Sequence, residues 1–154
     1  MIDEREEILK GMRAGPLVLR ALVRGLDDVT VRTRPADNEW AIIEVVAHLA
    51  DTDERALLRT RAMLVEDEPT LVPYDQHELA EERRYLEMEL DHELDRFERL
   101  RREQTELLAG LDDAAWRRIG NHGEHGRITV EQLAAHTAGE DVDHFAQIAR
   151  MLST

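Results

Sequence analysis

The sequence predicts an all-α protein, an antiparallel four-helix bundle made by a single domain that spans residues 1–154. Two observations support this fold class. Four long segments carry apolar side chains at the helical period, with charged side chains between them. The last segment also places acidic and histidine side chains on its apolar stripe, as in bundles that bind a metal or a ligand between facing helices. A chain of this length can bury a core without disulfides.

Composition narrows the possible functions. The 20 basic and 34 acidic residues give a formal net charge of −14, which argues against nucleic acid or an anionic membrane surface as the main partner. The chain has no cysteine, so we expect no disulfide, thiol nucleophile or thiolate metal site. No apolar run approaches the roughly 18 residues of a membrane span, and the acidic start lacks the apolar core of a signal peptide. We therefore expect a cytoplasmic protein with a small-molecule ligand.

The first predicted helix covers residues 3–26, and its Gly15-Pro16 pair indicates either a kink or a break. In the connection that follows, Val29, Val31 and Thr33 alternate and could form a short strand. The second helix is expected over residues 39–65, capped by Asp37 or Asn38.

The second half of the chain begins with residues 66–78, a predicted loop with two prolines and no helical period. A third helix is predicted over residues 79–110, because Gly110 is a natural stop. Residues 112–119 can add one helical turn anchored by Trp116, and the glycine-rich segment 120–127 is expected to be a loop. The last helix covers residues 129–154, and Thr129 and Gln132 have the spacing of a capping box.

This last helix carries the strongest functional signal. One stripe is formed by Val130, Leu133, Thr137, His144, Ile148 and Met151. Glu140 falls on the same stripe, with Asp141 at its edge. A carboxylate and an imidazole facing a core are costly unless they are paired or bind a metal. Glu140 and His144 are four residues apart and point the same way, so they form a candidate ligand pair; a buried ion pair or a helix open to solvent is the alternative.

His48 on the second helix is the candidate third ligand. Its stripe also carries Asp51, Arg55 and Arg59, and could be a solvated face. If this stripe faces the last helix across a cleft, His48, Glu140 and His144 supply two imidazoles and one carboxylate and leave positions open for water or substrate.

His136 lies one turn before Glu140, about 12 Å along the axis from His144. Both histidines cannot easily bind one ion together with Glu140. His136 is therefore expected to support a ligand or to replace one, and Asp51 has the same expected role.

The two arginines of the His48 stripe have two interpretations. Arg55 and Arg59 can form surface ion pairs with Asp51 and Glu44, or they can bind the anionic group of a carboxylate-bearing substrate beside the metal. The other histidines carry weaker signals. His122 and His125 are expected to be solvated, with a second, weak metal site as the alternative, and His77 and His92 are expected at the surface.

Two segments resemble the DinB/YfiT-like superfamily. PADNEWAIIEVVAHLADTDE, residues 35–54, resembles the tryptophan-containing opening and the His-Leu-Ala-Asp core of that family's second helix. TVEQLAAHTAGEDVDHFAQI, residues 129–148, resembles its last helix, which ends in a His-x-x-Gln-Ile pattern. The resemblance implies a four-helix bundle that binds a divalent metal, often nickel or zinc, through three histidines, and it implies frequent dimerisation. Some members are thiol-dependent transferases or isomerases that use bacillithiol, mycothiol or glutathione.

The resemblance matches His48 and His144 to two of the family's ligands. Glu140 stands where the family usually has its other histidine. This harder ligand shifts the preference away from soft metals and toward zinc, manganese or iron, and the expected divalent metals are zinc, nickel, manganese or iron. The first hypothesis is a metal-dependent S-transferase or hydrolase in which the metal activates a low-molecular-weight thiol or water. The second is a non-catalytic, metal-binding or stress-related bundle. A homodimer is expected in either case, because Leu-rich helices often keep apolar area after the bundle closes.

Overall fold

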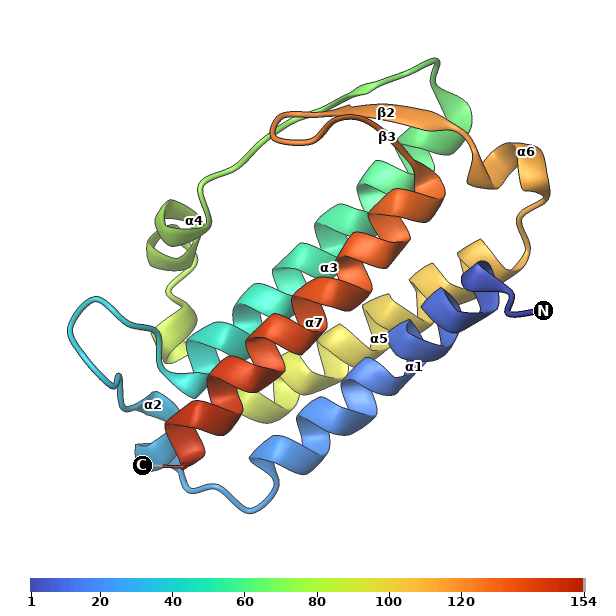
Figure 1. The fold of residues 1–154 in the computed structure, drawn as a ribbon. Coiled ribbons are helices and arrows are strands. Elements are labelled where there is room, and N and C mark those ends of the chain that lie inside the picture. The colour runs from blue at the N-terminus through green and yellow to red at the C-terminus, as the bar shows by residue number, and fades with distance from the viewer. Residues whose placement is uncertain (154) are drawn as a thin grey trace.

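The computed structural model describes residues 1–153, so Thr154 of the predicted last helix lies outside the described residues. The bundle consists of α1 (Glu4–Val23), α3 (Ile42–Val65), α5 (Leu90–Ala109) and α7 (Val130–Leu152). Helices α1 and α7 run in one direction and α3 and α5 in the other (Figure 1). Each of α1 and α3 packs against both α5 and α7. The predicted all-α four-helix bundle is confirmed.

The shorter elements lie in the connections. They are α2 (Asp28–Arg32), β1 (Thr70–Leu71), α4 (Gln76–Glu82), the 3₁₀ helix η1 (Tyr85–Glu87), α6 (Asp113–Trp116), β2 (Ile119–His122) and β3 (Gly126–Thr129). The strands form a sheet in the order β1-β2-β3, in which β1 pairs in parallel with β2 and β2 pairs antiparallel with β3. The sheet crosses one end of α3 and α7 (Figure 1). Across residues 1–153, no helix combines the length and hydrophobicity needed to cross a membrane.

The link between α3 and α5 is long because these helices run in the same direction, so the chain must travel back along the bundle. The predicted continuous helix over residues 79–110 is wrong here: α4 ends at Glu82, Arg84 takes a left-handed conformation with φ 54°, and α5 starts at Leu90. The cause is a tertiary contact. Tyr85 is buried, and its hydroxyl donates to the Asp51 carboxylate of α3.

Helix α1 continues through Pro16, so, of the two alternatives expected at Gly15-Pro16, a kink or a break, the break is wrong. Asp3 caps its start by accepting hydrogen bonds from the backbone N–H groups of Arg5 and Glu6. Proline has no N–H to give to the carbonyl four residues earlier, which leaves the Met12 carbonyl free. The Arg101 guanidinium of α5 donates to that carbonyl at 2.8 Å, so another helix satisfies the group that proline leaves open.

The structure differs from the prediction in the segment before the second long helix and at the start of that helix. The segment with Val29 and Val31 is helical rather than extended, because the Asp27 side chain caps it by accepting from the Thr30 N–H at 2.8 Å. Helix α3 begins at Ile42 with Ala41 as its cap residue, and the predicted caps Asp37 and Asn38 lie outside it.

The segment that leads into α7 is more ordered than expected. The predicted glycine-rich loop forms the β2–β3 hairpin, whose turn uses Gly126 with a φ of 68°. The predicted helical turn at Trp116 is confirmed as α6. The capping box is confirmed too: the Thr129 hydroxyl accepts from the Gln132 N–H, and the Gln132 side chain accepts from the Thr129 N–H.

A charged network lies inside the bundle. Arg101 is 1% exposed and reaches from α5 to Asp53 of α3, 2.8 Å away, and to Asp141 of α7, 2.6 Å away. Both carboxylates are buried as well. Gly15 of α1 faces this network: a Cβ placed there would lie 2.5 Å from Asp141 Oδ2 and 2.7 Å from Arg101 Nη1.

We expect Gly15→Ala to destabilise the fold by roughly 2 kcal/mol, because the added methyl group forces apart a buried ion network. Urea denaturation measures the change. Gly11→Ala is the matched control in the same helix, since the nearest atom to its new Cβ is Ala138 Cβ at 3.9 Å. The control is expected to be neutral or to stabilise by about 0.5–1 kcal/mol. Equal effects of the two substitutions would show that the network tolerates the methyl group.

The same network gives an expected pH dependence. Burial raises the pKa of the Asp53 carboxyl from 3.8 to about 6, although Arg101 opposes the shift. A carboxyl group whose pKa is higher in the folded than in the unfolded protein stabilises the fold at pH values below its unfolded-state pKa. This stabilisation is lost as the pH rises through its folded-state pKa. From about pH 5 to about pH 7.5 the wild type should therefore lose roughly 1 kcal/mol that Asp53→Asn does not lose. Urea denaturation of both proteins at the two pH values tests this, and parallel pH profiles would contradict it.

Candidate metal and ligand site

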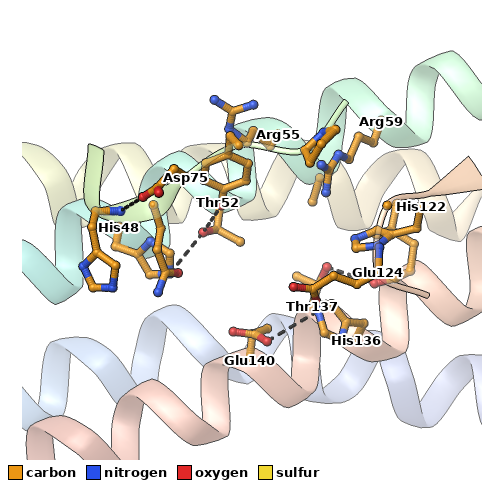
Figure 2. A pocket seen from close by; sticks show the side chains of 17 residues that line it. His48, Thr52, Arg55, Arg59, Asp75, His122, Glu124, His136, Thr137 and Glu140 are labelled. Carbon is orange, nitrogen blue, oxygen red and sulfur yellow. Dashed lines mark hydrogen bonds and ion pairs between the residues drawn. The ribbon is translucent and has the colours of Figure 1, made fainter. Parts of the chain in front are cut away.

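A cavity of about 440 Å³ lies between α3 and α7. Its floor and sides come from the two helices, and its cover comes from residues 73–77 and from the β2–β3 turn. Figure 2 shows Thr52 and Arg59 extending from α3 on the side that faces Glu140 of α7, whereas the Arg55 guanidinium points away from Glu140. His48 and Arg55 also line the cavity. The predicted stripe of α3 therefore does face the last helix across a cleft.

His48 is a buried imidazole with little hydrogen bonding. Its side chain is packed against the ring of Trp40, 4.9 Å away between ring centres. Its Nδ1 is the one buried side-chain nitrogen or oxygen of residues 1–153 without a hydrogen-bond partner, and its Nε2 has a 3.5 Å contact with the Thr52 hydroxyl. Burial, and then the neighbouring His144, lowers the pKa of His48 to about 3. The ring is therefore neutral at physiological pH, which is the form that binds metals.

His144 of α7 lies beside it, with ring centres 4.8 Å apart. Two imidazoles that bind one ion at about 2.1 Å have ring centres about 5 Å apart, so this spacing fits a shared ion. The His144 Nδ1 lies 3.0 Å from the Gln147 side-chain oxygen. An amide oxygen can only accept, so Nδ1 donates to Gln147, and Nε2 is the nitrogen on the side of Glu140.

Glu140 lies between two histidines of its own helix. One carboxylate oxygen is 3.5 Å from His144 Nε2 and the other is 3.4 Å from His136 Nε2. The predicted phase of the helix is partly wrong: Glu140 is 34% exposed and faces the cavity, whereas Asp141, expected at the edge, is buried against Arg101. Glu140 is thus accessible to a ligand and is not an acid trapped in the core.

These side chains meet the chemical requirements of a metal site without forming a closed one. In their present rotamers, residues 1–153 contain no group of three or more histidine, aspartate or glutamate side chains that could hold an ion. The donor atoms nevertheless fit. They are a neutral imidazole with no strong hydrogen bond, a second imidazole, and a carboxylate 3.5 Å from the Nε2 of that second imidazole. Ligands of one ion have a similar separation, about 3.0–3.5 Å. The ligand set His48, Glu140 and His144 stays a prediction.

The Asp51 carboxylate binds residues outside the cavity. One of its oxygens accepts from Arg83 at 2.6 Å and from Arg96, and the other accepts from the Tyr85 hydroxyl. These contacts anchor the α3–α5 connection and leave no carboxylate oxygen free for a metal. The alternative that Asp51 replaces a ligand therefore has no support in its contacts.

The interpretation of Arg55 and Arg59 as partners of Asp51 and Glu44 is wrong. Glu44 is bound by Arg34 at 2.8 Å, and Asp51 is taken by the contacts described above. Within residues 1–153, neither Arg55 nor Arg59 has a carboxylate within ion-pair distance. Arg55 stacks on the Tyr74 ring 3.7 Å away, and Arg59 donates to the Val72 carbonyl at 2.7 Å.

Two cavity residues were not expected from the sequence. His77 is exposed, as expected, but it lies in the first turn of α4, with its ring centre 5.1 Å from that of Trp40, at the cavity wall. His122, expected to be solvated, lines the cavity, and its Nδ1 accepts from the backbone N–H groups of Glu124 and His125. No local pattern marks either residue, because the α3–α5 connection and the hairpin bring them in. Their rings and those nearby form no closed metal site in residues 1–153.

Comparison with known proteins agrees with this architecture. A sequence model of the DinB superfamily matches residues 13–148. A Geobacillus thermodenitrificans protein named "Putative metal-dependent hydrolase" is 32% identical over 147 residues, which is 95% of this chain and 83% of the relative. A Geobacillus kaustophilus protein with the same kind of name is 30% identical over 149 residues, covering 96% of this chain and 84% of the relative.

The solved structure of YfiT from Bacillus subtilis has the same fold. It superposes with a TM-score of 0.90 at 24% identity, covers 98% of this chain and 88% of its own, and is described as a four-helix bundle of unusual topology. The resemblance noted in residues 35–54 and 129–148 is confirmed, because the family match extends over most of the chain between and around those segments. The chain belongs to the DinB superfamily.

Proposed function

We propose that this protein is a divalent-metal-dependent hydrolase whose ion is held by His48, Glu140 and His144. The observation that carries the proposal is the pair of adjacent imidazoles of His48 and His144, with the accessible Glu140 carboxylate 3.5 Å from His144 Nε2. His48 has an unpartnered Nδ1 and only a 3.5 Å contact at Nε2, so either nitrogen is available after a small rotation of the ring. The relatives named metal-dependent hydrolases support the reaction class.

A divalent ion in such a site polarises a carbonyl or phosphoryl oxygen and lowers the pKa of water or a thiol. The chain's own residues would orient and bind. Gln147 fixes the ring of His144 through Nδ1, and His136 holds the second oxygen of Glu140. Such supporting contacts tune affinity without supplying a ligand. The mixed nitrogen and oxygen set fits zinc, manganese or iron better than it fits a soft metal, with nickel as the family alternative.

S-transfer from a low-molecular-weight thiol is the second candidate. The chain has no cysteine, so a sulfur nucleophile would have to come from a small molecule. Two such thiols, glutathione and bacillithiol, carry carboxylates, and the two arginines that line the cavity have no carboxylate partner among residues 1–153. A non-catalytic metal-binding bundle, such as a stress-related protein, is the third candidate. We further propose a cytoplasmic homodimer, which the exposed side chains of Leu17, Val18 and Val142 on α1 and α7 support.

The metal assignment predicts a ranking of variants. His144→Ala should lose stoichiometric metal, because it removes a ligand, whereas His136→Ala should keep the metal with roughly 10–100-fold weaker affinity. Elemental analysis and a competition titration with a chromogenic chelator measure both. His92→Ala, on the exposed face of α5, is the matched control. The opposite ranking would move the site one turn along α7, to His136 and Glu140.

Glu140 provides an internal check of the same assignment. Glu140→His should keep or tighten metal binding, and Glu140→Leu should abolish it. A Glu140→Leu protein with unchanged metal content and a raised melting temperature would show that Glu140 is a destabilising acid and not a ligand.

The reaction class predicts turnover without added thiol. Metal-loaded protein should hydrolyse members of a panel of carboxylate-bearing esters, amides and phosphoesters, with oxygen from ¹⁸O-labelled water in the product. His144→Ala should lower the rate by at least about 100-fold, because the ion supplies most of the charge stabilisation, while His92→Ala should not change it. Turnover that requires an added thiol would favour S-transfer. Stoichiometric metal without turnover on either panel would favour the non-catalytic bundle.

A further inference from the structure

We propose that the hairpin end of the cavity is a subsite for the carboxylate or phosphate group of a small-molecule ligand, formed by Arg59 and His122, with the charge of Arg55 nearby. The inference deepens the proposed function, because it assumes that this cavity receives the substrate. In Figure 2, Arg59 and His122 lie at one end of the cavity and His48 at the other, with Glu140 between them on the opposite wall. A ligand bound by its anionic group at the first end would therefore extend toward the proposed metal site.

The arginines are unusual for this protein in lacking carboxylate partners. The chain carries 34 acidic and 20 basic residues, so most basic side chains can be expected to lie near a carboxylate. Arg83 and Arg96 bind Asp51, and Arg34 binds Glu44, so the two acids expected to pair with the cavity arginines have other partners. Among residues 1–153, Arg55 and Arg59 have only the Tyr74 ring and the Val72 carbonyl as close partners. Two unpaired guanidinium groups that line one cavity form an anion site.

The contacts of Arg59 orient it. One terminal nitrogen is held by the Val72 carbonyl at 2.7 Å, which leaves its remaining N–H groups for a ligand. Burial lowers the pKa of Arg59, Tyr74 opposes the shift, and Arg55 adds to it. A half-buried guanidinium next to a second one gains from any anion that enters, because the anion offsets both desolvation and like-charge repulsion.

His122 adds a neutral donor. Its Nδ1 accepts from the N–H groups of Glu124, at 3.1 Å, and His125, at 3.3 Å. An imidazole nitrogen that accepts hydrogen bonds has no proton, so in the neutral ring the proton is on Nε2. Burial, together with the charge of Arg59 and the rings of His125 and His136, lowers the pKa of His122, while Glu124 opposes the shift. The β2–β3 turn thus fixes His122 as a neutral hydrogen-bond donor at the cavity wall.

Nearby acids do not fill the subsite. Glu124 lines the rim, but its side chain is 84% exposed and its ion-pair contact is His125 at 3.8 Å. Glu140 is held between His136 and His144. Asp75, also at the wall, uses a carboxylate oxygen to cap α4 by accepting from the N–H groups of His77 and Glu78.

The test uses metal-free protein, so that a failure of the metal assignment does not affect it. Inorganic phosphate and acetate are the two probes, and binding is measured by calorimetry and by the chemical shifts of the His122 ring and the Arg59 Nε–H. We expect at least one probe to bind, to shift both groups, and to bind about tenfold or more weakly to Arg59→Gln, because a hydrogen-bonded charge partner is lost. The probe that binds more tightly identifies the ligand group as phosphate or carboxylate.

The His122→Asn variant distinguishes two roles of His122, the Nε2–H that donates to the anion and the Nδ1 that accepts hydrogen bonds in the β2–β3 turn. The Asn side-chain oxygen can stand where Nδ1 accepts the two backbone N–H groups, while the Nε2–H donor is lost. We expect weaker binding with unchanged stability and unchanged backbone shifts of the hairpin. Arg99→Gln and His92→Asn on the exposed face of α5 are the matched controls and should bind as the wild type does.

Three results would overturn the subsite. Neither probe binding at millimolar concentration would exclude it. Equal binding by Arg59→Gln, His122→Asn and their controls would place the anion elsewhere. Binding that appears only after metal loading and is lost in His144→Ala would make the anion a metal ligand, leaving the proposed function intact while the subsite fails.

Discussion

Among residues 1–153, the Arg101 guanidinium is the one side-chain group that makes hydrogen bonds from one bundle helix to all three others. It extends from α5 and donates to the Met12 carbonyl of α1, to Asp53 of α3 and to Asp141 of α7. A buried cation is tolerated only if its donors meet acceptors of good geometry. The rotation of each helix about its axis is therefore constrained by one side chain. The Gly15-Pro16 pair of α1 serves this contact, because glycine leaves room for the network and proline frees the Met12 carbonyl.

This network also positions the candidate site. Successive helical residues point about 100° apart, so a helix that turns Asp141 toward Arg101 turns Glu140 toward the cavity. His144 follows one turn later on the same side. On α3, His48 precedes Asp53 by five residues and points about 140° away from it. The interior ion network and the cavity thus occupy different sides of the same two helices.

Local information explains what the sequence could predict. Apolar periodicity located the four bundle helices, and the Thr129 and Gln132 pair located the start of α7. The stripe of α7 identified Glu140 and His144 as neighbours, since both lie one turn apart on one face. The approach of His144 to His48 followed only if α3 faced α7, and their ring centres are 4.8 Å apart.

The errors come from contacts between distant residues. Glu140 and Asp141 exchanged their expected places because the partner of Asp141 is on another helix. The interruption between α4 and α5 depends on the Tyr85 contact with Asp51, which no local pattern reveals. The same Asp51 contact left the cavity arginines without their expected partner. The wrong expectation for the partners of Asp51 therefore caused two errors, one in the boundary between α4 and α5 and one in the expected partners of the cavity arginines.

The cover of the cavity is built from segments outside the bundle. The α3–α5 connection supplies residues 73–77 and the β2–β3 hairpin supplies His122 and Gly123, and the two are joined by the short parallel pairing of β1 with β2. The candidate metal ligands, in contrast, stand on α3 and α7, which Arg101 holds in place. The candidate metal ligands and the segments that control access to the cavity are therefore on different parts of the fold. Insertions or substitutions in the cover can change which molecule enters the cavity without changing the core that keeps the protein folded.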